Sequence, residues 1–227
     1  MRRKYSSFLT ILLIVIIIAV IGLLAFLGYQ TYTKNKATND ASDAVDSFLS
    51  DDAVVNPGNG GTNTQNTDMG DITTEETNTS GGGSSSSTTA KRKTYKGFYM
   101  LGTIEIPKTG VKYPVLEKVT KKSLETAVAV IYPFENPELN VPGNVVIVGH
   151  NYRNGTFFSN NKRLSNGDKI KITDLNKNTV TYTIYKIFET TETDTTFYNR
   201  DTNGKREVTL STCTDDSSKR IIIQARE

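Results

Sequence analysis

The sequence predicts an all-β domain, built as a barrel or a sandwich, that follows an N-terminal membrane anchor. Three observations predict this arrangement. An uncharged apolar run lies near the N-terminus, a long polar and repetitive segment follows it, and short strand-like runs separated by turn signals begin at Tyr95. The chain after residue 90 is about 137 residues long, within the usual domain size of roughly 100–150, so it can bury a core of its own.

The apolar run Phe8–Gly28 is expected to be a transmembrane anchor. At about 1.5 Å rise per residue, a helix of this length just crosses a hydrocarbon core of roughly 30 Å. A cleaved signal peptide is the alternative, but its apolar region is usually about 7–15 residues long, and no Ala-x-Ala site follows closely. Arg2, Arg3 and Lys4 precede the run, so residues 1–7 are expected in the cytoplasm and the rest of the chain outside the cell.

Residues 29–94 are expected to form a flexible, low-complexity linker. Asn, Thr, Ser, Gly and Asp dominate the segment, which includes the run Gly81–Ser87. Such a composition buries too little apolar surface to offset the entropy of ordering the chain. A short helix around Asp40–Leu49 is conceivable but has little to pack against. A tether of about 60 residues, with an end-to-end distance of roughly 40–45 Å, would let the domain search a shell above the membrane.

Residues 95–227 show the β pattern, with no βαβ rhythm and no internal repeat. One helical turn is expected at Lys121–Ala127, a short helix at Thr156–Leu164, and a polar loop at Glu189–Gly204. The strand-like runs are Gly102–Pro107, Val111–Glu117, Val145–Val148, Asp168–Thr173, Val180–Phe188, Glu207–Cys213 and Arg220–Arg226.

The net charge of +3 is unevenly distributed along the chain. Acidic residues outnumber basic ones in residues 34–90, whereas basic residues outnumber acidic ones in residues 91–227. A moderately basic domain suits a polyanionic setting such as membrane headgroups or wall polymers, although a well-solvated basic surface is an equally plain explanation. Nucleic acid is not expected as a partner, because no binding motif appears and the chain has an anchor.

Three residues at strand edges carry the chemistry. Cys213 is the only cysteine of the chain and His150 the only histidine, and Arg220 opens the strand after the cysteine. A thiolate is a strong nucleophile, an imidazole can take and give a proton, and a guanidinium can hold an oxygen that becomes negative. Together they suggest acyl transfer. Singly, each has a structural alternative: a buried thiol, a structural histidine or a solvated arginine.

Strand parity supports the combination. Val208 and Leu210 should face the core, so Cys213 points to the other face of its strand. In the last strand, Ile221 and the alternate positions after it face inward, so Arg220 also points outward. The cysteine and the arginine are therefore expected on the same outer face of neighbouring strands.

These residues resemble those of the sortases, the membrane-anchored cysteine transpeptidases of Gram-positive cell surfaces. The run Thr209-Leu210-Ser211-Thr212-Cys213 fits the TLxTC signature of the family, and His150, Arg220 and the uncleaved anchor agree with it. The resemblance extends over about residues 98–227. It implies an eight-stranded sortase-type β-barrel with short helices, and a catalytic domain at residues 95–227.

The resemblance also implies a reaction. Cys213 would attack the Thr–Gly bond of an LPxTG-like sorting signal to form a thioacyl-enzyme, which an amine of a cell-wall precursor or a pilin lysine would resolve. His150 would be the general acid/base, and Arg220 the oxyanion-stabilising or substrate-orienting cation. Thr212 is similar to a position that helps the oxyanion site, and Asn151 is a candidate for orienting the imidazole or contacting substrate, or for a simple turn.

Two other classes of function remain open: another extracytoplasmic cysteine hydrolase or wall cross-linker, and a non-catalytic tethered binding module. An L,D-transpeptidase-like enzyme would need a Ser-x-Gly-Cys-x-Arg arrangement that is absent. Within the sortases, the lack of a lid motif before the barrel and of a second apolar span favours a class D-like or class B-like enzyme. No cofactor is expected, and the spacing of Glu117, Glu135 and Glu138 establishes no metal site.

Overall fold

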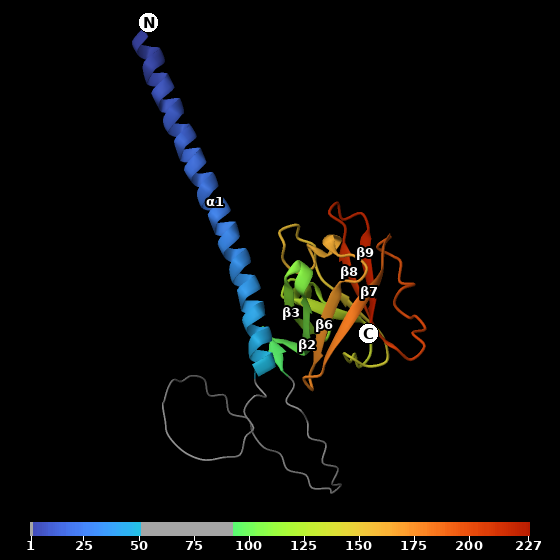
Figure 1. Ribbon diagram of the computed structural model, residues 1–227. Coiled ribbons are helices and arrows are strands. Elements are labelled where there is room, and N and C mark those ends of the chain that lie inside the picture. The colour runs from blue at the N-terminus through green and yellow to red at the C-terminus, as the bar shows by residue number, and fades with distance from the viewer. Residues whose placement is uncertain (1, 51–92) are drawn as a thin grey trace, which may run out of the picture.

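The computed structural model describes residues 2–50 and 93–227, with side chains from Leu9 onward. A long helix, α1 (Arg2–Ser50), lies beside a β-barrel in which the strands of the N-terminal half and those of the C-terminal half form two adjoining groups (Figure 1). The low-complexity part of the expected linker, residues 51–92, lies outside the described residues.

The barrel consists of eight strands, as expected. The strands run in the order β2-β3-β4-β5-β8-β9-β7-β6, and pairing of β6 with β2 closes the sheet. Most neighbours are antiparallel, but β3–β4 and β5–β8 are parallel. The two-residue strand β1 (Thr94–Tyr95) only extends the edge of β2. The strands are β2 (Phe98–Ile106), β3 (Val111–Leu116), β4 (Val128–Tyr132), β5 (Gly143–Val148), β6 (Lys169–Asp174), β7 (Thr179–Thr190), β8 (Arg206–Cys213) and β9 (Arg220–Arg226).

The core fills the barrel interior and confirms the parity prediction. Val208 and Leu210 of β8 and Ile221 and Ile223 of β9 belong to one large buried cluster. Because side chains alternate along a strand, the intervening positions face outward. A second, smaller cluster lies on that outer face, where Ile222 and Val146 pack under Phe197 of the loop between β7 and β8.

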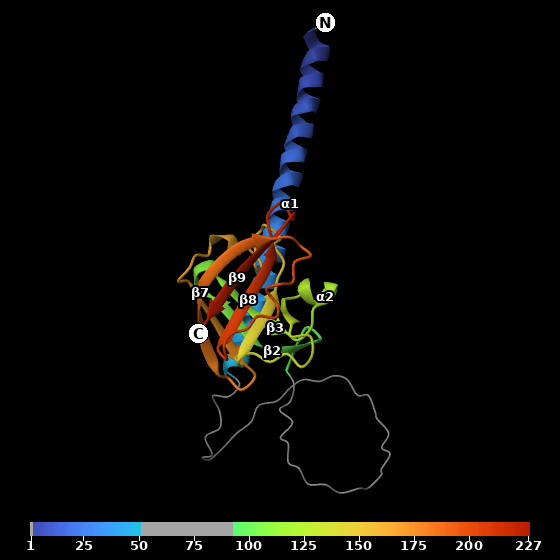
Figure 2. The ribbon, with the colours of Figure 1, turned by 90° about the vertical axis from the view of Figure 1, so that its right-hand side faces the viewer.

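Helix α1 (Arg2–Ser50) is 49 residues long, which corrects the expected start of the linker. Residues 29–50 continue the helix instead of forming flexible chain. The stripe of Ala41, Val45 and Phe48, with spacings of four and three residues, is buried against the barrel and supplies the packing surface that the sequence did not reveal. The helix contacts mainly β3. Figure 2 shows its lower part behind the strands.

The short helices agree only partly with expectation. Helix α2 (Lys121–Leu124) is the predicted single turn, and it begins with a capping box between Thr120 and Ser123. The helix expected at Thr156–Leu164 is wrong, because only the 3-10 turn η2 (Asn161–Arg163) forms there. Another 3-10 turn, η1 (Pro107–Thr109), joins β2 to β3.

Candidate active site

Cys213 and Arg220 lie directly opposite each other at the ends of β8 and β9. They are the last Cα partners of this antiparallel pair. Arg220 Nη1 donates a hydrogen bond to the Cys213 sulfur. The pairing therefore brings together the nucleophile and the cation that the sequence predicted, on the outer face of the barrel.

His150 follows β5, which runs parallel to β8 on its other side. Parallel pairing places the ends of β5 and β8 at the same end of the barrel, and Gly149 N donates to the Ser211 carbonyl at 3.2 Å. Gly149 is needed there because Phe158 packs against it: a Cβ at this position would lie 2.8 Å from the Phe158 ring and 2.9 Å from Val128. The fully buried Phe158 ring thus determines where the chain turns into His150.

The loop after His150 folds back on itself and supports the imidazole. Phe158 N donates to the His150 carbonyl at 3.1 Å. Tyr152 lies over the imidazole with 4.8 Å between ring centroids and an interplanar angle of 32°. Phe157 continues the row of rings from Tyr152 to Tyr113, at centroid distances of 5.7 and 5.1 Å. Aromatic contacts to the barrel therefore limit how far the imidazole can move.

His150, Cys213 and Arg220 line one cleft of about 230 Å³. The structure thus brings the three predicted catalytic residues to one site. Thr212 also lines the cleft, together with Glu192 and Tyr198, which the sequence did not single out. Apolar side chains form much of the remaining wall, namely Val119, Leu124, Ile131 and Val148.

The two weaker candidates differ in their placement. Thr212 is 3% exposed, and its Oγ1 has no hydrogen-bond partner among the described residues. Thr212 alternates with Cys213 and lies on the side of β8 that carries the core residues Val208 and Leu210. Asn151 instead uses its amide within the protein: Nδ2 donates to the Cys213 carbonyl at 3.0 Å and to Asp215 Oδ1 at 2.9 Å, and Oδ1 accepts from Arg153 N at 3.0 Å. It ties the histidine loop to the cysteine strand.

The charges around the cleft act on the imidazole. Burial lowers the pKa of His150 below its ordinary value, Glu125 raises it, and the Arg220 guanidinium lowers it. The net direction is downward, so the imidazole is mainly neutral at neutral pH and can accept a proton. Burial likewise raises the pKa of Tyr198, with Arg220 acting against it, so this phenol remains protonated.

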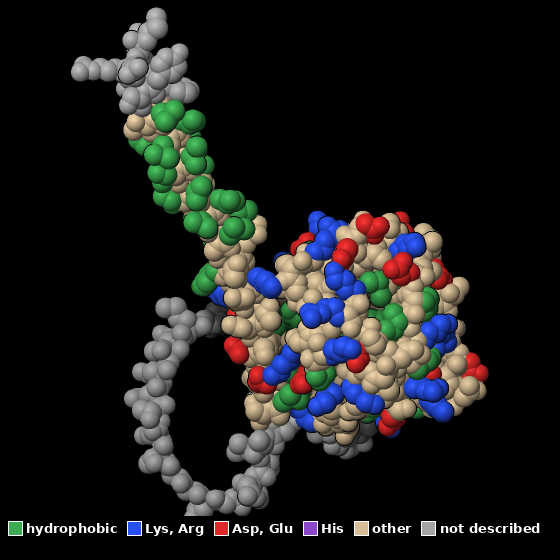
Figure 3. Space-filling model, turned by 45° about the horizontal axis from the view of Figure 1, so that its top comes forward, with side chains coloured by type: hydrophobic (Ala, Val, Ile, Leu, Met, Phe, Trp, Pro, Cys, Tyr) green, Lys and Arg blue, Asp and Glu red, His purple; other side chains and the backbone are tan. Residues whose placement is uncertain are grey.

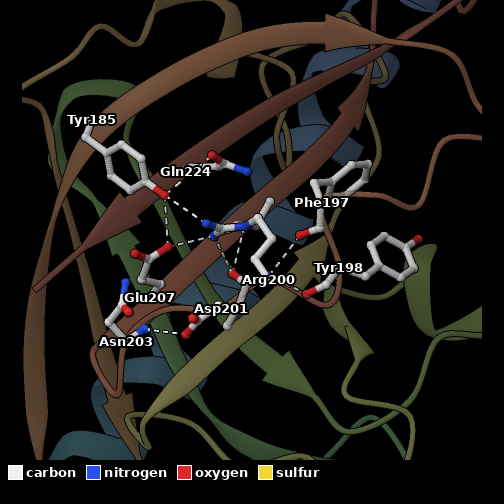
Figure 4. A network of polar contacts seen from close by, with 10 residues as sticks. Tyr185, Phe197, Tyr198, Arg200, Asp201, Asn203, Glu207 and Gln224 are labelled. Atoms are coloured by element: carbon white, nitrogen blue, oxygen red, sulfur yellow. Dashed lines mark hydrogen bonds and ion pairs between the residues drawn. The ribbon is translucent and has the colours of Figure 1, made fainter.

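The β7–β8 loop (residues 191–205), which supplies Glu192 and Tyr198, is fastened to the barrel by a polar network. Arg200 lies at its centre, with Nη2 2.7 Å from Glu207 Oε2 and Nη1 2.9 Å from the Tyr185 hydroxyl (Figure 4). Asn144 of β5 donates to the carbonyls of Phe197 and Tyr198 at 3.0 and 2.8 Å. Ring contacts between Tyr132 and Tyr198 add to this attachment. The network sets the position of one wall of the cleft.

No group of three or more His, Cys, Asp or Glu side chains within the described ranges is placed to hold a metal ion. The cleft offers a thiol, a neutral imidazole and a guanidinium beside apolar side chains. This set can form and resolve an acyl intermediate on sulfur. Residues far from the signature, such as Glu192 and Glu125, carry no sequence signal. The adjacent aromatic residues Phe197 and Tyr198 did carry a sequence signal. Two aromatic side chains in a polar loop need a surface to pack on, so they indicated that this loop packs against the domain.

The model of the sortase domain family matches residues 104–227. "Sortase A" of Bacillus anthracis is 34% identical over 127 residues, which are 55% of this chain and 58% of that protein, so the chain matches less than two thirds of this relative.

Solved structures are similar as well. A Clostridium perfringens Sortase D5 transpeptidase is 32% identical with a TM-score of 0.50, covering 56% of this chain and 78% of that one. A lid mutant of Sortase A from Corynebacterium diphtheriae is 27% identical with a TM-score of 0.51, covering 56% and 69%. The signature at Cys213, the closed eight-stranded barrel and a family match over more than half of the residues lead to one conclusion: this chain belongs to the sortase family.

Proposed function

We propose that this protein is a membrane-anchored cysteine transpeptidase that cleaves an LPxTG-like sorting signal and joins the acyl fragment to an amine. The single observation that carries the proposal is the shared cleft of His150, Cys213 and Arg220. Family membership supports it, and so does the name of the Clostridium perfringens Sortase D5 transpeptidase, which also favours the class D-like alternative for the subclass.

The first half-reaction forms an acyl-enzyme. Neutral His150 first takes the proton of the Cys213 thiol. The thiolate then attacks the scissile carbonyl, a C–S bond forms, and the oxygen becomes negative. Arg220, which lines the cleft, would donate to that oxygen, and Thr212, just before Cys213, would help to form the oxyanion site. Protonated His150 then gives its proton to the leaving amine, and the C–N bond breaks. The product is a thioester on Cys213 with a neutral imidazole beside it.

The second half-reaction reverses these roles. The incoming amine attacks the thioester carbon while neutral His150 removes its proton, and the C–S bond breaks to regenerate the thiolate. The lowered pKa of His150 suits this step, because the base must be neutral when the amine arrives. An amine of a wall precursor or a pilin lysine would serve, and no cofactor takes part.

The proposed location is the outer face of the cell membrane. One helix of the described residues is apolar and long enough to cross a membrane, near the N-terminus. With Arg2, Arg3 and Lys4 on the cytoplasmic side, the barrel would lie outside the cell, where surface proteins and wall precursors meet.

The test is incubation of the full chain with an LPxTG peptide and an oligoglycine amine. The expected result is a thioacyl adduct on Cys213 and a new amide product, both visible by mass spectrometry. Cys213→Ala should give neither, and Arg220→Met should slow adduct formation by roughly 10²-fold or more, as removal of an oxyanion donor does. Amide formation by Cys213→Ala at the normal rate would refute the proposal. Hydrolysis of the peptide without amine transfer would favour the hydrolase alternative, and absence of any turnover the binding module.

A further inference from the structure

Helix α1 and the barrel contact each other along a continuous line of residues. Lys34 approaches the active-site loop, where its Nζ lies 3.3 Å from the place that a Cβ on Gly155 would take. Further along, Asp40 pairs with Lys96 at 3.2 Å, and Asp46 pairs with Lys112 of β3. Because these contacts are spread over several helical turns, they fix the orientation of the helix axis relative to the barrel.

The last contact lies at the opposite end of the barrel from the active site. The Phe48 ring is beneath Lys177 of the β6–β7 turn, with 3.9 Å from Nζ to the ring centroid, and Lys93 also lies over it at 5.1 Å. The helix therefore passes the active-site loop first and the β6–β7 turn last. Figure 1 shows this order: the red hairpin between β8 and β9 points toward the N-terminal half of α1, while the orange β6–β7 turn points away from it.

The order of contacts sets distances from the membrane. The uncharged run of α1 ends at Gly28, six residues before Lys34, which is about 9 Å at 1.5 Å per residue. Phe48 lies twenty residues beyond Gly28, or roughly 30 Å along the axis. The headgroup layer on each face of a bilayer is about 5–7 Å thick. The active-site end of a docked barrel therefore lies next to the headgroups, and its other end lies far from them.

The side chains of this end fit such a surface. Arg153, Lys162 and Lys219 are exposed around the β8–β9 hairpin, and Arg153 and Lys162 bond Ser217 and Asp215 of that hairpin. Figure 3, which brings this end forward, shows Lys and Arg side chains across it together with some acidic ones. Basic side chains near a bilayer are attracted by anionic lipid headgroups.

We propose that residues 29–50 of α1 form a rigid stalk that docks on the barrel and holds the active-site cleft facing the membrane surface, within reach of peptide bonds and amines presented at the bilayer. The α1 stripe of Ala41, Val45 and Phe48 is the docking surface. The proposal rests on the proposed function for the nature of the substrates. The orientation itself depends on α1 crossing the membrane and on its contacts with the barrel.

The test measures orientation without measuring activity. The full chain, in a Cys213→Ala background, is placed in anionic lipid vesicles with a fluorophore on one new cysteine, either Ser217→Cys in the β8–β9 hairpin or Asn176→Cys in the β6–β7 turn. The vesicles carry a spin-label quencher on their headgroups. Quenching is expected to be several-fold greater at position 217 than at position 176.

A matched pair of stalk variants then tests docking. Val45→Asp puts a charge into the docked stripe and should remove most of the difference between the two labels. Ser47→Asp adds the same charge on the exposed side of the helix and should preserve it. Circular dichroism and thermal unfolding check that the barrel is folded in both variants.

Equal quenching at the two positions with the unmodified stalk would overturn the proposal, and so would a difference that survives Val45→Asp. Transpeptidation with soluble peptide and soluble amine is measured separately, in chains that retain Cys213, and Val45→Asp should leave it unchanged. Failure of that reaction in the unmodified chain would count against the proposed function and would leave the orientation result standing.

Discussion

Asn151 Nδ2 donates a hydrogen bond to the carbonyl of Cys213, at 3.0 Å, and so links the histidine loop to the nucleophile strand. The same nitrogen also bonds Asp215, in the loop beyond the cysteine. The two segments come from distant parts of the chain, and this amide is a direct polar link between them. We therefore predict that Asn151 acts as a positioning residue.

Asn151→Ala should reduce kcat about fivefold, because a hydrogen bond of this kind contributes roughly 1 kcal/mol. The KM for the sorting peptide should change little, since the cleft wall is otherwise intact. Steady-state kinetics of amide formation provide the measurement. Asn176→Ala, on the exposed β6–β7 turn, is the control and should behave as wild type. An Asn151→Ala enzyme with an unchanged kcat would contradict the positioning role.

The pH dependence should follow His150. Its lowered pKa means that the folded state takes up this proton less readily than the unfolded chain. The contribution of His150 to stability therefore rises with pH from the folded pKa up to about 6.5, the ordinary value, and is unfavourable below that range. Activity that needs the neutral base should rise with pH through the same folded pKa.

Glu125→Gln should lower the pKa of His150 further, because Glu125 is the group that raises it. The acidic limb of kcat/KM should then move to lower pH. His150 is the only histidine, so its ring-proton NMR titration is unambiguous. Glu135→Gln, which removes a carboxylate from an exposed loop, is the control and should leave the pKa of His150 unchanged. An upward shift in Glu125→Gln would show that the assigned electrostatics are wrong.

Gly149→Ala should destabilise the barrel by about 1–3 kcal/mol, the usual cost of forcing an extra carbon into a packed site. The added Cβ would meet Phe158 and Val128 at under 3 Å, and the displaced turn would move the imidazole. Urea unfolding measures the stability, and kcat should fall with it. Combining the change with Phe158→Leu should restore part of both. Wild-type stability in the single variant would mean that Phe158 does not control this turn.

Arg200→Met should lower stability by about 1–3 kcal/mol, less than a fully buried pair because Arg200 is partly exposed. In a domain of this size, each kcal/mol corresponds to roughly 2–4 °C in Tm. The KM for the peptide should rise, because the β7–β8 loop supplies Tyr198 to the wall of the cleft and would no longer be held in place. Adding Glu207→Leu to this variant removes the carboxylate that has lost its partner, and it should restore part of the decrease in Tm. A Tm that drops further in the double variant would contradict this account of the network.

Much of the site was predictable from local sequence. Alternation in β8 and β9 located the outward faces of Cys213 and Arg220, and the spacing between them fits an antiparallel hairpin. The apolar run before His150 marked a buried strand. These signals are local because the period of a strand is visible in a few residues. That β5 lies beside β8 was not visible, since parallel pairing joins residues about sixty positions apart.

The stalk was missed for a related reason. Residues 29–50 are polar over most of their surface, and only Ala41, Val45 and Phe48 show a narrow apolar stripe. Such a stripe predicts a helix only when a partner surface is known, because packing provides most of the stability of a helix. Likewise β4, which the sequence left unassigned, and the network around Arg200 depend on contacts that no short window contains.

The opposition of Cys213 and Arg220 is set by the register of β8 and β9 over seven successive pairs, from Glu207 opposite Arg226 onward. The connecting turn closes on itself through Thr214 and Lys219. Residues inserted at its tip would therefore lengthen the turn without separating nucleophile from cation, which makes it a place to graft a foreign peptide. A slip of one residue between the two strands, in contrast, would turn one of these side chains into the barrel interior and abolish the enzyme while the sheet remained hydrogen-bonded.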